Sequence, residues 1–111
     1  MKRYVFCETG AGWVRPDAKV YKNERVIAFF DRAPVTEYHT LVVTKRHARD
    51  IFDVKEEGLL AVTSAIRLIC QVYREKLGIK DVQIVSSNGN DAQQDTYHLH
   101  FHIIPRAHGD G

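Results

Sequence analysis

Apolar residues alternate with polar ones, or run together in short blocks, at five places along the chain. Each of these blocks predicts a β-strand. The predicted strands cover residues 19–21, 25–30, 40–44, 82–86 and 98–104. In the third block the apolar residues are consecutive, which is typical of a strand buried on both faces.

Between the third and fourth strands the apolar spacing changes to steps of three and four, which predicts a helix over residues 56–77. The apolar residues on one side of this helix are Leu59, Val62, Ile66, Ile69, Tyr73 and Leu77. Asp53 and Glu56 form a candidate capping pair, and Gly78 stands where a helix should end. Strands, then a helix, then strands predict an α+β domain, with an antiparallel sheet of about five strands backed by one long helix.

The last predicted strand carries a histidine at every second position: His98, His100 and His102. Because successive side chains of a strand point to opposite faces, the three imidazoles should line one face, roughly 7 Å apart. One histidine in such a strand would most often be structural, but three on one face indicate a functional site. The residues expected to face the helix instead are Leu99, Phe101 and Ile103.

Composition narrows the class of protein. A chain of 111 residues, with 44% hydrophobic and 27% charged residues, is expected to form one domain over residues 1–111. Sixteen basic and 14 acidic residues form no basic stripe, so we expect no nucleic-acid partner. No window approaches the roughly 20 apolar residues of a membrane span, so we expect no membrane association. Cys7 and Cys70 form no disulfide framework, which favours a reducing, cytoplasmic location.

Alternating imidazoles can serve two chemistries. Asp31 and Asp95 could complete a metal site with them. Alternatively, a neutral imidazole could attack an electrophile such as phosphorus. A long polar loop, residues 87–96, precedes the strand and offers anion-holding donors from Ser87, Asn88 and Gln94. Spacing alone leaves both chemistries open.

The run His98-Leu99-His100-Phe101-His102-Ile103-Ile104-Pro105-Arg106 resembles the signature of the histidine triad (HIT) family of nucleotidyl hydrolases and transferases. Further matches are Phe29-Phe30-Asp31 with Pro34 and His39, residues 41–47, and Ala92-Gln93-Gln94. The resemblance covers most of the chain and implies a HIT-like fold. It also implies a homodimer formed by helix packing and sheet continuation.

The resemblance implies a role for each matching residue. His100 would attack the α-phosphorus, His98 and His102 would bind phosphate oxygens and assist the leaving group, and His39 would orient the row. Asp31 would hold the ribose hydroxyls. His39 and Asp31 also have plainer interpretations, as a buried histidine and as a turn residue. The remaining nucleotide contacts would come from Phe6 and Ile27 at the base, unless they are core residues, and from Ser87, Asn88 and Gln94 at the phosphates.

The implied reaction releases a nucleoside monophosphate, with AMP as the expected product, through a nucleotidyl-histidine intermediate. The enzyme would be either a purine nucleoside phosphoramidase or a dinucleoside polyphosphate hydrolase. Two other functions stay open: a purine-nucleotide-binding sensor or adaptor with weak turnover, and a metal-dependent hydrolase using the histidine row.

No cofactor is expected to be required. Some family members hold a structural zinc, but Tyr4 stands where one cysteine ligand would be. Cys7, His47 and His98 are then one ligand short of four, so we expect no zinc. Ser87, Asp95 and Thr96 depart from the family pattern in the loop.

Overall fold

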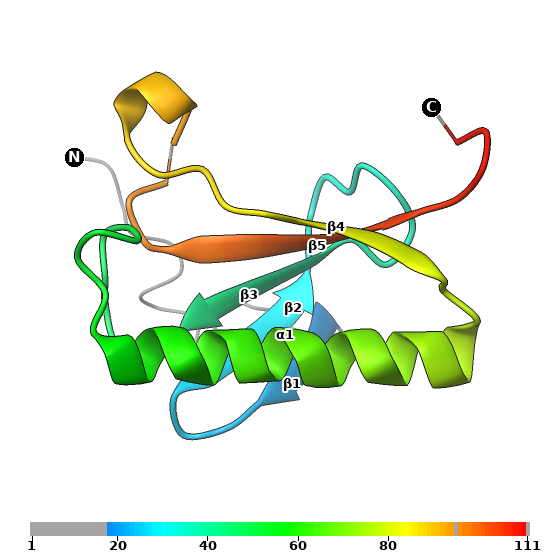
Figure 1. Ribbon diagram of the computed structural model, residues 1–111, viewed down its shortest axis with the longest axis horizontal. Helices are drawn as coiled ribbons and strands as arrows, with labels where there is room; N and C mark the ends of the chain where they lie inside the picture. The colour runs from blue at the N-terminus through cyan, green and yellow to red at the C-terminus, as the bar shows by residue number, and fades with distance from the viewer. Residues whose placement is uncertain (1–17, 95, 111) are drawn as a thin grey trace.

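The computed structural model describes residues 18–94 and 96–110, and these form one five-stranded antiparallel sheet backed by a long helix (Figure 1). The strands lie in the order β1-β2-β3-β5-β4. In chain order the elements are β1 (Lys19–Lys22), β2 (Val26–Phe30), β3 (Thr40–Thr44), α1 (Glu56–Leu77), β4 (Asp81–Val85), the short 3₁₀ helix η3 (Asn90–Ala92) and β5 (His100–Arg106). The predicted fold class is therefore confirmed.

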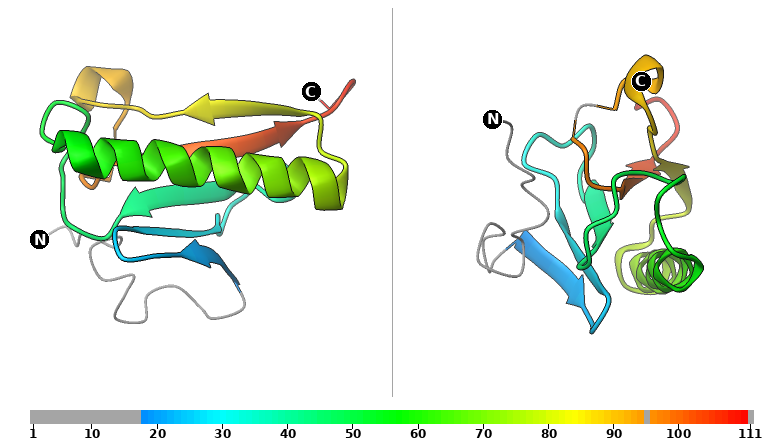
Figure 2. Two further views of the ribbon diagram at one scale, coloured as in Figure 1. Left: turned by 60° about the horizontal axis from the view of Figure 1, so that its bottom comes forward. Right: turned by 90° about the vertical axis from the view of Figure 1, so that its left-hand side faces the viewer.

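Helix α1 covers one face of the sheet, as the end-on view in Figure 2 shows. Its buried residues, Val62, Ala65, Ile66, Ile69 and Tyr73, recur at the predicted spacing. They pack with Val26, Ala28, Val42 and Ile103, which are fully buried, and with Phe101, which is partly buried. Leu99 is also buried, but it precedes β5 and lies outside this cluster.

Strand β3 is buried on both faces, as predicted, and all five of its side chains are covered. Val42 faces the helix, whereas Leu41 and Val43 pack on the other side of the sheet with Ile27 and Phe29. Because Leu41 pairs with His102 and Val43 with His100, these two histidines stand on that second side. The sheet thereby separates the helix core from the histidine face.

Two predicted details are wrong. Asp53 does not cap the helix: the N-cap residue is Lys55, with no side-chain cap bond, and the Asp53 carboxylate accepts from the Arg49 amide at 2.9 Å. At the other end Gly78 has the expected left-handed backbone, with φ 68°. Strand β5 begins at His100 rather than His98, because the Leu99 amide donates to the Ala48 carbonyl in the loop after β3.

Strand β5 also runs past the predicted end and includes Pro105. The ladder with β3 stops at Ile103, so Pro105 pairs only with Val82 of β4. On the side where β3 has ended, no strand needs an amide hydrogen from residue 105. Proline is therefore acceptable here, although the earlier part of β5 lies between two strands. Within the described segments, α1 included, no helix is both long and apolar enough to cross a membrane.

Candidate active site

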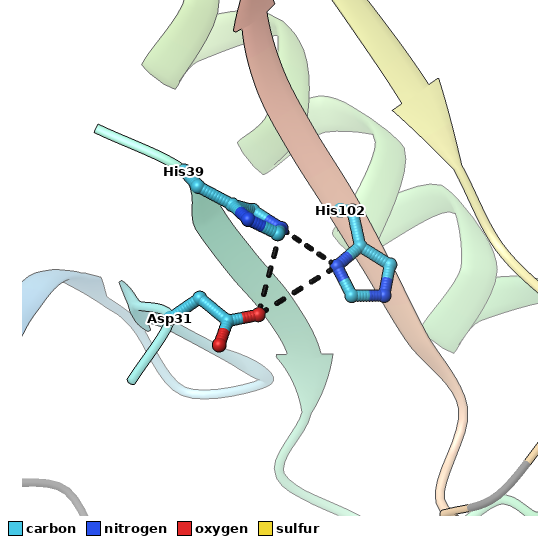
Figure 3. Close-up of side chains that lie close together, drawn as sticks. All are labelled: Asp31, His39 and His102. Carbon is cyan, nitrogen blue, oxygen red and sulfur yellow. Dashed lines mark hydrogen bonds and ion pairs between the residues drawn. The ribbon is translucent and has the colours of Figure 1, made fainter. Parts of the chain in front are cut away.

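The sheet brings together Asp31, His39 and His102, which are far apart in sequence (Figure 3). Asp31 follows β2 and His39 precedes β3, and the Asp31 amide donates to the His39 carbonyl at 2.9 Å. His102 stands on the neighbouring strand β5. Nδ1 of His102 lies 2.8 Å from Nε2 of His39, a short hydrogen bond between two imidazoles. His39 therefore contacts the histidine row, and its expected role of orienting the row stays a prediction.

The proton positions in this pair follow from a backbone donor. The Val35 amide donates to Nδ1 of His39 at 3.1 Å, so that nitrogen carries a lone pair and the neutral ring has its proton on Nε2. His39 therefore donates from Nε2 to Nδ1 of His102. Neutral His102 must then carry its own proton on Nε2. His102 is thus prepared to donate a hydrogen bond from Nε2.

His100 holds the opposite tautomer. Its Nδ1 lies 2.8 Å from the carbonyl oxygen of His98, and a carbonyl can only accept, so Nδ1 carries the proton. The lone pair of neutral His100 is consequently on Nε2. The rings of His100 and His102 are 5.2 Å apart at 74°, edge to face. Neighbouring imidazoles of β5 therefore hold opposite tautomers, with the lone pair on Nε2 of His100 and the proton on Nε2 of His102.

His98 has a different environment from the one predicted. Its side chain is 0% exposed, and its Nε2 donates to the Thr44 carbonyl at 2.7 Å. The pKa of His98 is lowered from 6.5 to about 4, chiefly by burial; the hydrogen bond to Thr44 opposes this shift, and the neighbouring His47 and His100 add to it. A buried nitrogen engaged in this way is not available to a phosphate oxygen, so the expected phosphate contact is corrected. His98 instead anchors the backbone carbonyl that orients His100.

Gln94 is likewise a structural residue rather than a phosphate ligand. Its side chain is 4% exposed and makes three hydrogen bonds. Oε1 accepts from the Gly89 amide at 2.7 Å, while Nε2 donates to the carbonyls of Arg49 and Thr96 at 2.8 and 3.1 Å. Because these bonds occupy the whole amide, the expected contact with phosphate or leaving group is corrected. Gln94 joins the loop before β5 to the segment after β3.

Gln94→Ala is expected to lower the free energy of unfolding by about 2 kcal/mol, because the Gly89 amide and the Arg49 and Thr96 carbonyls lose partly buried hydrogen bonds. Urea denaturation of the variant beside the wild type measures the difference. Gln71→Ala on the exposed side of α1 is the matched control and is expected to change stability by less than about 0.5 kcal/mol. Equal effects of the two substitutions would contradict the assignment.

The structure describes two further residues expected to contact a nucleotide, Ser87 and Asn88. Asn88 accepts from the Ile51 amide at 2.7 Å and donates to Ser86 Oγ at 3.0 Å, so it too ties the loop to the segment after β3. Ser87 is half-buried in the same loop, and contacts of Ser87 and Asn88 with a nucleotide stay predictions. Phe6 and Asp95 lie outside the described residues.

Ile27 lies on the histidine face and is fully buried with Phe29, Leu41 and Val43. The register aligns Ile27 with Val43, and Val43 with His100, in one row across the sheet. Ile27 is therefore two strands away from His100, about 10 Å at the usual strand spacing. Both of its proposed interpretations, base pocket and core, are compatible with this position.

Asp31, His39 and His102 offer ligand atoms within 4.8 Å of one another, so a metal site must be weighed. Nitrogen ligands around a tetrahedral zinc lie roughly 3.3 Å apart, whereas Nε2 of His39 and Nδ1 of His102 are at the hydrogen-bonding distance of 2.8 Å. The Val35 amide also places the proton of His39 on the nitrogen that would have to bind metal. The geometry favours a hydrogen-bonded pair of imidazoles over a metal site.

Of the three candidate zinc ligands that the sequence suggested, the structure describes His47 and His98. Cys7 lies outside the described residues. The rings of His47 and His98 are 5.1 Å apart, edge to face, and His98 donates from Nε2 to Thr44. The expected absence of zinc stays a prediction.

Three contributions to the site were missed by reading side chains alone: the Val35 amide, the Thr44 carbonyl and the carbonyl of His98. All three are backbone groups, so residue type gives no indication of them. Tyr38 was missed as well. It has a left-handed backbone with φ 66° just before His39, and its ring packs against Phe30 and Tyr73. Such a backbone is uncommon for tyrosine and shapes the turn that holds His39.

Comparison with known proteins agrees with this geometry. The family model of the HIT domain matches residues 13–109. "Protein hit" of Bacillus subtilis is 37% identical over 108 residues, covering 96% of this chain and 74% of that protein. An uncharacterized HIT-like protein of Methanocaldococcus jannaschii is 38% identical, covering 96% and 81% of the two chains. The crystal structure of a HIT family member from Bacillus subtilis superposes with a TM-score of 0.87 at 34% identity, covering 98% of this chain and 77% of that one.

Proposed function

The chain belongs to the HIT family, whose members are nucleotide-binding hydrolases and transferases, and on that premise we propose that it releases AMP through a nucleotidyl intermediate on His100. The substrate would be a phosphoramidate or a polyphosphate ester of adenosine. The observation that carries the proposal is the tautomer of His100, whose Nδ1 donates to the His98 carbonyl at 2.8 Å. This bond leaves the lone pair of Nε2 for attack on phosphorus.

The reaction would run in two displacements. Nε2 of His100 forms a bond to the α-phosphorus, while the bond from phosphorus to the leaving group breaks and its electron pair departs with that group. Water then attacks the same phosphorus, the bond to Nε2 breaks, and AMP is released. His102 supports both steps by donating from Nε2 to oxygens that gain negative charge.

Mass analysis of protein quenched in acid tests the covalent step. Wild-type protein is mixed with adenosine 5′-phosphoramidate in metal-free buffer with a chelator present, and the reaction is stopped within one turnover. The expected result is a protein whose mass has increased by one adenylyl group. Saturable binding without an adduct would favour a nucleotide-binding sensor or adaptor. Turnover that occurs only when the chelator is left out would favour a metal-dependent hydrolase.

We further propose that the protein forms a homodimer across β4 and α1. Strand β4 is an edge strand, and Ile84 and Val85 on it are 45% and 39% exposed. Helix α1 adds an exposed apolar row on the side away from the core, formed by Leu60, Leu68 and Val72. An edge strand with apolar side chains invites pairing with a second strand.

Light scattering after size-exclusion chromatography is expected to give twice the chain mass of 12.7 kDa. Leu68→Glu would place a charge in the proposed interface and is expected to shift the protein toward the monomer. Glu24→Gln, in the exposed turn between β1 and β2 and far from β4 in the strand order, serves as the control and should leave the dimer intact. A wild-type monomer at all concentrations would refute this arrangement.

A further inference from the structure

The Asp31 carboxylate is held in a fixed orientation beside the hydrogen-bonded imidazoles of His39 and His102. Its Oδ1 accepts from the Ala33 amide at 2.9 Å, which directs Oδ2 toward the two rings. Oδ2 lies 3.5 Å from Nε2 of His39 and 3.9 Å from Nδ1 of His102 (Figure 3). These distances are longer than good hydrogen bonds but well within the range of an ion pair. The carboxylate faces the bond between the imidazoles.

In the arrangement seen here, His102 can donate a hydrogen bond but is poorly suited to transfer a proton. Its Nδ1 accepts from His39, so the only proton of the neutral ring is on Nε2. Losing that proton would create an imidazolate, which is far too basic to form near neutral pH. Gaining a proton at Nε2 is equally excluded because this nitrogen is already protonated.

A protonated His102 would need a different partner. The imidazolium carries hydrogen on both nitrogens, and its Nδ1–H cannot point at the Nε2–H of His39 across 2.8 Å. Oδ2 of Asp31 can accept from both rings if the carboxylate and the imidazoles approach by about 1 Å and the imidazole pair opens. The negative charge of the carboxylate would also stabilise the imidazolium.

We propose that Asp31 and His39 are alternative partners of Nδ1 of His102, and that pairing with Asp31 turns His102 from a hydrogen-bond donor into an acid and a base. Asp31 is a positioning residue in this scheme, in addition to its expected contact with ribose. The inference rests on the proposed nucleotidyl transfer through His100 and adds the source of the proton for the leaving group.

The proton balance closes over one turnover of an amine phosphoramidate. As His100 Nε2 bonds to phosphorus, the bond from phosphorus to the amine nitrogen breaks, and its electron pair takes the Nε2 proton of the His102 imidazolium. His102 is left neutral, with its proton on Nδ1 toward Asp31 and a lone pair on Nε2. That lone pair then accepts a proton from the water that attacks the nucleotidyl-histidine, which restores the imidazolium.

The proposal predicts that removing the Asp31 charge affects substrates according to their leaving group. An alkylamine must be protonated to depart, whereas p-nitrophenolate leaves as the anion. Asp31→Asn is therefore expected to slow single turnover of an alkyl phosphoramidate of AMP by at least about 100-fold, and of the p-nitrophenyl ester of AMP by less than about 5-fold. Both substrates contain the same AMP, so a lost ribose contact affects both rates equally and cancels in their ratio.

Asp81→Asn makes the same chemical change at an exposed position at the start of β4 and should leave both rates unchanged. Equal losses on the two substrates in Asp31→Asn would overturn the inference while leaving nucleotidyl transfer intact. Wild-type protein that forms no adduct with either substrate would instead refute the proposed function. If circular dichroism finds Asp31→Asn unfolded, Asp31→Ser keeps an oxygen for the Ala33 amide and is expected to give the same difference between substrates.

Discussion

Replacing His100 by alanine is expected to reduce single-turnover release of AMP by at least about 10⁴-fold, because no covalent intermediate can form without Nε2. The nearest imidazole, His102, cannot substitute for it. Its Nδ1 accepts from His39 and its Nε2 carries the proton, so the neutral ring offers no lone pair to phosphorus. The rate is measured with adenosine 5′-phosphoramidate and with enzyme in excess over this substrate.

Binding should survive this substitution. The affinity for AMP, measured by calorimetry, is expected to change by less than about 10-fold, because the remaining contacts persist. His108→Ala, in the exposed segment after β5, is the control and should retain full activity. Residual turnover of His100→Ala above about one tenth of the wild-type rate would exclude His100 as the nucleophile.

Acidification is expected to destabilise the protein through His98. Burial lowers the pKa of His98 to about 4 in the folded protein, while the unfolded chain has the ordinary value near 6.5. The unfolded state therefore binds this proton first as pH falls. The stabilisation from neutral His98 is complete above pH 6.5, and about 3 kcal/mol of it is lost as the pH falls to 4.

Urea denaturation at a series of pH values between 7 and 4 measures this loss. Asp110, whose pKa is lowered to about 2 by Arg106, loses its contribution only as the pH falls toward the ordinary aspartate value of 3.8, so it affects only the lower end of this interval. His98→Gln is expected to be less stable at pH 7 but to lose much less stability on acidification. His108→Gln, in the exposed segment after β5, should keep the wild-type dependence. The same slope in His98→Gln and wild type would contradict the assignment.

Acid destabilisation of this kind would also affect catalysis indirectly. The His98 carbonyl accepts the proton of His100 Nδ1, so charging and displacing the buried ring would release the bond that sets the tautomer of His100. The three histidines of the row therefore have three different environments: His98 is buried on the Thr44 carbonyl, His100 donates from Nδ1 to the His98 carbonyl, and His102 contacts His39.

Much of this molecule was determined by the sequence itself. Apolar steps of three and four residues defined α1 over the observed Glu56–Leu77, because a helix of this length buries one side whatever it packs against. Consecutive apolar residues identified β3 as covered on both faces. Strict alternation placed His100 and His102 on the face opposite Phe101 and Ile103, since the period of a strand is two.

What only the tertiary structure decided was the partner of each polar atom. Alternation could not distinguish His98, which is buried on the Thr44 carbonyl, from His102, which meets His39 across the sheet. Gln94 looked like a phosphate ligand until the fold brought Arg49 and Gly89 to its amide. These hydrogen bonds join residues distant along the chain, or backbone groups common to every residue type. Such pairings depend on which strands become neighbours and in what register, and no local pattern contains that information.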